Sequence, residues 1–147
     1  MKYFFDLEET LITDFDNPRI INRDKVKYLN YPVEVGVFSF AIWNEMDRIR
    51  FNSQIKPMIE DTFNVIVTEA PTMDEMVEVL KEKWTAIDDR DDIFDFFGKE
   101  RTFVEYCRLM YPGEPCTLVD DQVPNAVYRE GLVTGPEITT ININELI

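Results

Sequence analysis

The chain has 147 residues, of which 45% are apolar and 13% aromatic, so we expect one folded domain with an ordinary core. It carries 29 acidic and 15 basic residues, and the net charge of -14 disfavours nucleic acids and anionic membranes as partners. The absence of histidine excludes Ser-His-Asp and Cys-His catalysis and His-ligated zinc.

The expected location follows from segments that the sequence lacks. No stretch approaches the roughly 18 consecutive apolar residues of a membrane span, so we expect no membrane association. The first residues, MKYFFDLEE, do not resemble a secretory signal. Cys107 and Cys116 have no metal-motif spacing and are interpreted as reduced thiols in or near the core. We therefore expect a cytoplasmic protein.

Apolar runs and helical periodicities alternate along the chain. Short apolar runs predict buried strands at residues 2–5, 33–38, 64–67, 116–119 and 138–143. Helical spacing predicts a helix within residues 40–60, which Pro57 interrupts or follows, and another near 99–110. A third helix is expected after the capping box of Thr72 and Glu75, and a short fourth helix at 123–131 would be closed by Gly131. This alternation favours an α/β fold, with a Rossmann-like parallel sheet covered by helices on both faces, in a single domain over residues 1–147.

Three of the predicted strands stop at polar residues. The first stops at Asp6, the second at Ser39 and the fourth at Asp120 and Asp121. Ligands of open parallel sheets bind beyond the carboxyl ends of the strands, so these side chains converge if the strands are neighbours. Clustered carboxylates repel one another unless a cation lies among them, and Mg²⁺ is the usual cation where phosphate is also bound. Such a site suits a carboxylate nucleophile that attacks phosphorus.

Four segments resemble the motifs of haloacid-dehalogenase-like (HAD-like) phosphatases and occur in the family's order. They are residues 4–11 (FFDLEETL), 37–39 (VFS), 98–99 (GK) and 118–126 (LVDDQVPNA), the last followed by Gly131. The resemblance covers almost the whole chain, and the first and last motifs together are its most specific part. It implies a HAD-like fold and a magnesium-dependent phosphatase that hydrolyses a phosphomonoester.

The resemblance also implies a role for each matching residue. Asp6 would be the nucleophile that forms an aspartyl-phosphate, and Glu8 would act as general acid and then as general base. Ser39 would hydrogen-bond a phosphoryl oxygen, and Lys99 would neutralise charge on the phosphoryl group and the nucleophile.

The Mg²⁺ ligands implied by the resemblance come from both ends of the chain. They are Asp6, the backbone carbonyl of Glu8, and Asp121 with Asp120 beside it. Two positions depart from the family pattern, because Glu8 stands where the family usually has Asp and Glu9 stands where it often has Gly. A misplacement of about 1 Å can cost on the order of 10²-fold in rate, so these departures bear on turnover more than on the fold.

The family often inserts a cap domain, and this chain has no room for one. About twenty residues separate Leu11 from Val33, which is too few for an independent domain. An open site suits a bulky phosphorylated substrate, including a macromolecule, or a protein partner that supplies the lid.

The alternative function is that of a catalytically weakened or inactive HAD-like protein that serves as an acidic binding protein. Glu8, Glu9, the missing cap and the negative charge all favour it. Trp43 and Trp84 are interpreted as packing residues in either case.

Overall fold

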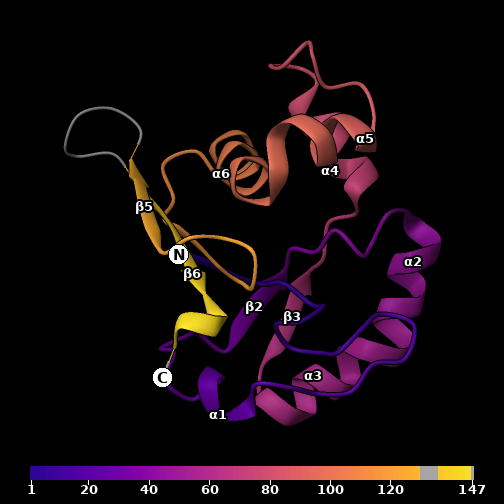
Figure 1. Cartoon of the computed structure of the whole chain (residues 1–147), viewed down its shortest axis with the longest axis vertical. Coiled ribbons are helices and arrows are strands. Elements are labelled where there is room, and N and C mark those ends of the chain that lie inside the picture. The colour runs from indigo at the N-terminus through magenta and orange to yellow at the C-terminus, as the bar shows by residue number, and fades with distance from the viewer. Residues whose placement is uncertain (130–135, 147) are drawn as a thin grey trace.

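The aromatic run at the start of the chain forms an inner strand of a six-stranded sheet in the computed structural model, which describes residues 1–129 and 136–146. The strand order is β3-β2-β1-β4-β6-β5 (Figure 1). The strands are β1 (Lys2–Phe5), β2 (Glu34–Val37), β3 (Ile66–Glu69), β4 (Cys116–Asp120), β5 (Ala126–Arg129) and β6 (Glu137–Asn142). All neighbouring strands are parallel except β5 and β6, which pair antiparallel. The fold is therefore mixed α/β with a mostly parallel sheet.

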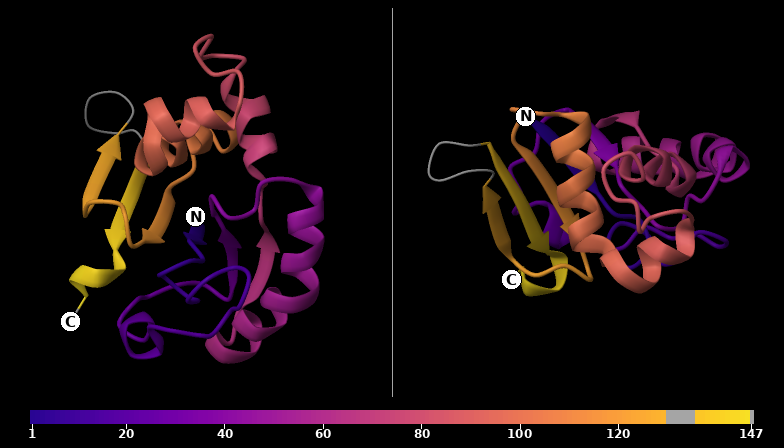
Figure 2. Two further views of the ribbon diagram at one scale, coloured as in Figure 1. Left: turned by 45° about the vertical axis from the view of Figure 1, so that its right-hand side comes forward. Right: turned by 90° about the horizontal axis from the view of Figure 1, so that it is seen from above.

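Helices cover both faces of this sheet (Figure 2). The α-helices are α1 (Arg23–Val26), α2 (Glu45–Arg50), α3 (Lys56–Phe63), α4 (Met73–Leu80), α5 (Arg90–Asp92) and α6 (Gly98–Met110). Two π-helical turns, η1 (Phe51–Ile55) and η2 (Ile93–Phe97), precede α3 and α6, and a 3₁₀ turn, η3 (Ile143–Glu145), follows β6. Within the described ranges, no helix has the length and apolarity needed to cross a membrane.

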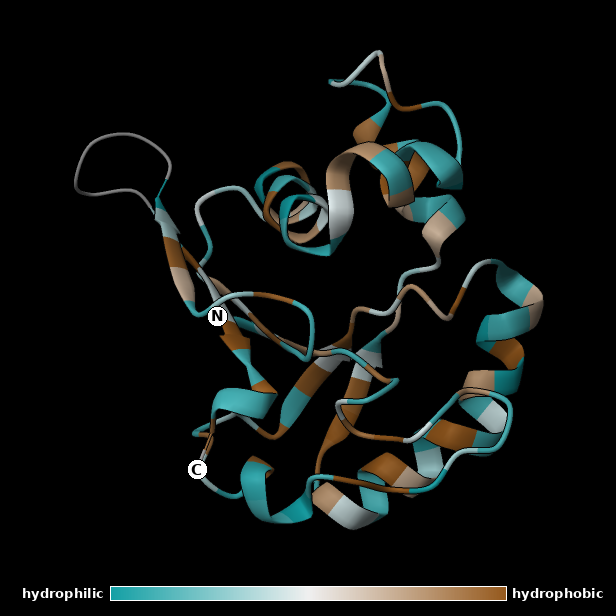
Figure 3. Cartoon of the chain, in the orientation of Figure 1, coloured by the Kyte–Doolittle hydropathy of each residue, from teal (hydrophilic) through white to brown (hydrophobic). Residues whose placement is uncertain are grey.

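Successive side chains of β1 lie on opposite faces of the sheet, and this divides the core into two layers. Tyr3 and Phe5 join the cluster that packs against η1 and α3, whereas Phe4 joins the cluster under α4 and α6. Figure 3 shows hydrophobic residues concentrated in the strands and alternating with hydrophilic ones along the helices. Burying each large apolar side chain contributes about 1.5–3 kcal/mol, so both layers hold β1 firmly in the middle of the fold.

The strand β2 lies unusually close to the ring of Phe4. A Cβ atom added to Gly36 would lie 2.5 Å from two ring carbons of Phe4, which is too close for any side chain. Gly36 is opposite Phe4 in the register between β1 and β2. The glycine therefore lets a full aromatic ring fill the layer under α6 while the two strands remain paired.

Two sequence expectations about secondary structure were wrong. The predicted helix at 123–131 is instead the edge strand β5, and Gly131 lies outside the described residues. Val127 and Tyr128 favour a strand, and pairing with β6 satisfies their backbone groups. The sheet is consequently not purely parallel.

In residues 40–60, the helix begins at Glu45 and continues past Pro57 to Phe63, and the π-helical turn η1 ends two residues before the proline. The π turn accommodates Pro57, because proline has no N–H for the usual helical bond.

The buried face of this helix is formed by its later residues. Met46 is 75% exposed and Ile49 is also exposed, whereas Phe51, Ile55 and Ile59 are fully buried.

The capping box before α4 is confirmed. The hydroxyl of Thr72 accepts from the backbone N–H of Glu75 at 3.1 Å, and the Glu75 carboxylate accepts from the backbone N–H of Thr72 at 2.9 Å.

Candidate functional site

The carboxyl ends of β1 and β4 form the switch point of the sheet. The chain leaves β1 toward β2 on one side and leaves β4 toward β6 on the other, so the connections diverge between these two neighbours. Open α/β sheets bind ligands in the crevice at this place. Asp6 directly follows β1, and its backbone N–H donates to the carbonyl of Val119 on β4 at 2.9 Å. The backbone pairing therefore fixes Asp6 beside the end of β4.

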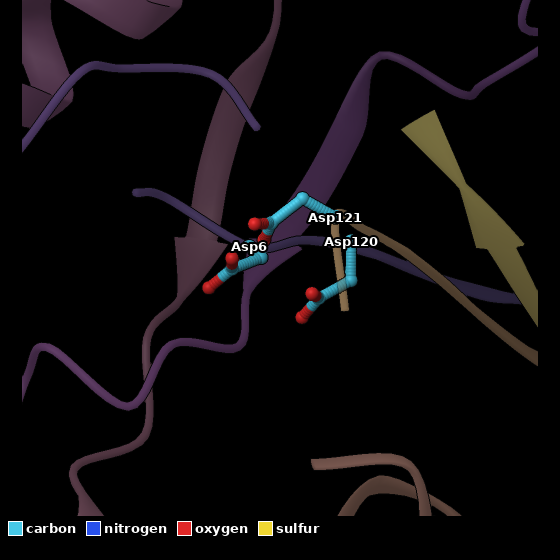
Figure 4. Close-up of side chains that lie close together, drawn as sticks. All are labelled: Asp6, Asp120 and Asp121. Carbon is cyan, nitrogen blue, oxygen red and sulfur yellow. The ribbon is translucent and has the colours of Figure 1, made fainter. Parts of the chain in front are cut away.

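Three aspartates from these two strand ends come together. Each of Asp6, Asp120 and Asp121 offers one carboxylate oxygen, and these oxygens lie within 4.8 Å of one another (Figure 4). Asp6 is 6% exposed and Asp120 1% exposed, and Asp121 is half-buried. The sequence prediction that the N-terminal aspartate and the late acidic pair converge is thus met by the geometry. Like charges this close require a cation, a shared proton or both.

Lys99 enters the cluster from the first turn of α6. Its Nζ lies 2.9 Å from Oδ1 of Asp6 and 2.9 Å from Oδ2 of Asp120, and its side chain is only 8% exposed. Burial alone would lower the pKa of Lys99, but the attraction of Asp6 and Asp120 outweighs burial and raises it. The lysine is therefore a fixed positive charge, although one cation faces three carboxylates.

The two buried aspartates differ in their remaining contacts. Oδ1 of Asp120 accepts from the backbone N–H of Gln122 at 2.8 Å, whereas its Oδ2 is paired with Nζ of Lys99 at 2.9 Å. Oδ2 of Asp6 accepts a long hydrogen bond of 3.4 Å from the hydroxyl of Thr10. Thr10 is fully buried and had no role assigned from the sequence, although it lies within the first motif, four residues after Asp6.

Burial raises the pKa of Asp6 to about 7; the nearby Lys99 opposes this rise and the negative charge of Asp120 adds to it. Burial also raises the pKa of Asp121, together with the negative charge of Asp120. Both pKa shifts have the same cause, because burial removes the water that would otherwise solvate the charged carboxylate. A divalent cation among the three oxygens would remove this penalty.

A cavity of about 760 Å³ opens in front of the cluster and is lined by Asp6, Lys99, Asp121 and Ser39, among others. Ser39 is buried two residues after β2, and its hydroxyl oxygen accepts from the backbone N–H of Ala41 at 3.0 Å. That bond leaves the hydroxyl proton available to a ligand in the cavity. The bond to Ala41 is therefore compatible with the predicted phosphate contact of Ser39.

Glu8 also lines the cavity, but its side chain is not part of the aspartate cluster. Its Oε2 accepts from the backbone N–H of Phe15 at 2.8 Å, which ties down the loop between β1 and α1. Glu9 has a φ of 61°, in the left-handed region where a side chain is strained. A glycine, which the phosphatases that the sequence resembles often have at this position, would adopt this conformation without strain.

The cavity also has aromatic lining that sequence reasoning missed. Phe40, Trp43 and Phe94 all line it, and Trp43 and Phe94 are each 45% exposed. The interpretation of Trp43 as a packing residue is therefore wrong, whereas Trp84 packs against the core under α6. Trp43 lies four residues after Ser39, and this closeness to a strand-end hydroxyl was the available signal.

Comparison with known proteins does not identify the chain. No protein-family model, curated protein or solved structure matches it. Function must therefore be argued from the geometry of Asp6, Lys99, Asp120 and Asp121.

Proposed function

We propose that this chain is a magnesium-dependent phosphomonoester hydrolase of the HAD-like type without a cap domain. One observation carries the proposal: the ends of β1 and β4 bring three aspartates within 4.8 Å, and a buried lysine, 93 residues from Asp6, contacts two of them. The resemblance had assigned a nucleophile, a phosphate-facing lysine and metal ligands to these positions. Their meeting at the switch point of the sheet supports that assignment.

The donor set fits a hard divalent cation. Asp6, Asp120 and Asp121 offer only oxygen, and Lys99 balances one of their charges, so negative charge remains. Oδ2 of Asp120 already has a cationic partner, Nζ of Lys99 at 2.9 Å, which shows that positive charge is favoured among these buried carboxylates. When bound, Mg²⁺ would neutralise these carboxylates and polarise a phosphoryl oxygen.

In the proposed reaction, a carboxylate oxygen of Asp6 attacks phosphorus and the bond to the ester oxygen breaks. Glu8 gives its proton to the departing alcohol, so the products of this step are the alcohol and an aspartyl-phosphate. Glu8 then takes a proton from water, whose oxygen attacks phosphorus and releases inorganic phosphate and free Asp6. Lys99 and the hydroxyl of Ser39 hold the phosphoryl oxygens throughout.

Glu8 can take this part without leaving its loop. Oε2 binds the backbone of Phe15, and the other carboxylate oxygen is left for proton transfer into the cavity that Glu8 lines. The loop from β1 to β2 contains only the short helix α1, so this connection supplies no lid. A large phosphorylated substrate, including a macromolecule, is therefore accommodated.

A second candidate is an inactive HAD-like protein that binds a basic partner protein. The strain at Glu9 and the longer side chain of Glu8 favour it, because both residues depart from the pattern of the family that the sequence resembles. The same assay separates the two functions, since a binding protein turns over no ester.

The test is hydrolysis of p-nitrophenyl phosphate with Mg²⁺ and with EDTA. We expect Mg²⁺-dependent turnover, and at least a hundredfold loss in Asp6→Asn, because the nucleophile is removed. Asp61→Asn, an exposed aspartate on α3, is the matched control and should keep the parent rate. Equal rates for Asp6→Asn and the parent would exclude the aspartyl-phosphate route and leave the binding function.

A further inference from the structure

The cavity in front of Asp6 has an aromatic wall that is rigid and open to solvent. The indole N–H of Trp43 donates to the backbone carbonyl of Phe40 at 2.7 Å, which fixes the ring. The rings of Phe40 and Phe94 meet edge to face with centroids 5.3 Å apart. Because Trp43 and Phe94 stay nearly half exposed while held in place, their surfaces are available to a ligand without prior ordering.

This aromatic wall already contacts cations. Nζ of Lys99 lies 4.7 Å from the ring centroid of Phe40, and the guanidinium of Arg90 lies 4.6 Å from that of Trp43. Both distances are within the range of cation–π attraction. The exposed remainder of Trp43 and Phe94 offers the same kind of contact to a bound cation, and quaternary ammonium groups are recognised in this way.

The rest of the cavity lining is strongly acidic. Seven of the lining side chains are carboxylates and two are cations. Both cations are already engaged, since Lys99 pairs with Asp6 and Arg50 pairs with Asp16 at 2.9 Å.

Five lining carboxylates form no ion pair within residues 1–129 and 136–146, and three of these, Glu9, Asp14 and Asp47, have no role in the proposed phosphate and metal site. A ligand that reaches past the phosphate site therefore meets uncompensated negative charge and aromatic rings.

We infer that the preferred substrate is a phosphomonoester whose alcohol carries an organic ammonium or guanidinium group close to the ester oxygen. This inference rests on the proposed hydrolase function. Lys99 and the metal would hold the phosphate, and Glu9, Asp47 and Trp43 would attract the cation while repelling anionic alcohols. Hydrolysis consumes one water and yields the cationic alcohol and inorganic phosphate. The cation can belong to a small amino alcohol or to a lysine or arginine next to a phosphoserine.

The experiment compares phosphocholine, glycerol 3-phosphate and 3-phosphoglycerate as substrates, with Mg²⁺ and at low ionic strength. We expect kcat/KM for phosphocholine to exceed that for glycerol 3-phosphate by about tenfold, and 3-phosphoglycerate to be the poorest of the three. The preference should shrink as salt is added. Phosphoserine peptides flanked by lysine or by glutamate form a second arm, and a larger kcat/KM for the lysine peptide than for phosphocholine would assign the cation to a protein.

Variants connect the preference to the cavity walls. Trp43→Leu and Asp47→Asn should each reduce the phosphocholine-to-glycerol-phosphate ratio of kcat/KM, together by about tenfold. Phe96→Leu, an aromatic that is exposed but does not line the cavity, is the matched control and should leave the ratio unchanged. A ratio of one or less in the parent, with p-nitrophenyl phosphate still hydrolysed, would overturn this inference alone. No turnover of any ester would overturn the hydrolase function and this inference together.

Discussion

Without a metal, the ionised form of Asp6 should destabilise the fold. The pKa of Asp6 rises from 3.8 to about 7 on folding, because the side chain is buried. The folded state therefore keeps a proton that the unfolded chain loses, and the contribution of this group to stability is fully present below pH 4 and is lost as the pH rises through 7. A rise of about three pKa units at 1.36 kcal/mol per unit corresponds to about 4 kcal/mol.

The assay is urea unfolding of the parent and Asp6→Asn in EDTA at several pH values from 4 to 8. Asparagine cannot ionise, so the free energy of unfolding of the parent, relative to the variant, should fall by up to about 4 kcal/mol across this range. Adding Mg²⁺ at pH 8 should restore stability to the parent, by about 2.7 kcal/mol at a hundred times its Kd. A difference that stays constant with pH, or that changes with the opposite sign, would refute this account of the buried carboxylate.

Two further substitutions test the charge balance and the packing. Lys99→Met leaves Asp6 and Asp120 buried without their cation, so urea unfolding at pH 7 should show that the free energy of unfolding falls by about 3–5 kcal/mol. A fall of less than about 1 kcal/mol would mean that the two carboxylates are solvated or already protonated. Gly36→Ala places a methyl group 2.5 Å from the ring of Phe4, and thermal unfolding should show a loss of about 1–3 kcal/mol, whereas an unchanged melting temperature would contradict the close approach of β1 and β2.

The sheet was largely predictable because its inner strands are apolar runs bounded by polar residues. The strands that contain Phe4, Val35 and Leu118 could be identified in this way, and so could the capping box at Thr72. The edge strand β5 was not, because it is half exposed and exists through its pairing with β6 rather than through its own pattern. Strand order and helix exposure likewise depend on contacts between distant segments.

The candidate site was likewise predictable only in part. Asp6 and Asp120 could be singled out because each follows an apolar strand, and their convergence follows from a parallel sheet in which the two strands are neighbours. The contact between Lys99 and these acids could not be derived from spacing, since it depends on how α6 packs against the sheet. The aromatic wall was missed because an exposed tryptophan and a packed one have the same sequence pattern.

The 93-residue separation between Asp6 and Lys99 also bears on how the chain folds. The sheet can bring Asp6 and Asp120 together only once β1 and β4 have paired, and the lysine joins them only when α6 docks. Contacts between such distant segments slow the search for the native state. An intermediate with its strands paired but α6 undocked would hold these acids next to one another with no counter-charge. Electrostatic repulsion would then raise the free energy of that intermediate, so strand pairing and helix docking are driven to occur in one cooperative step.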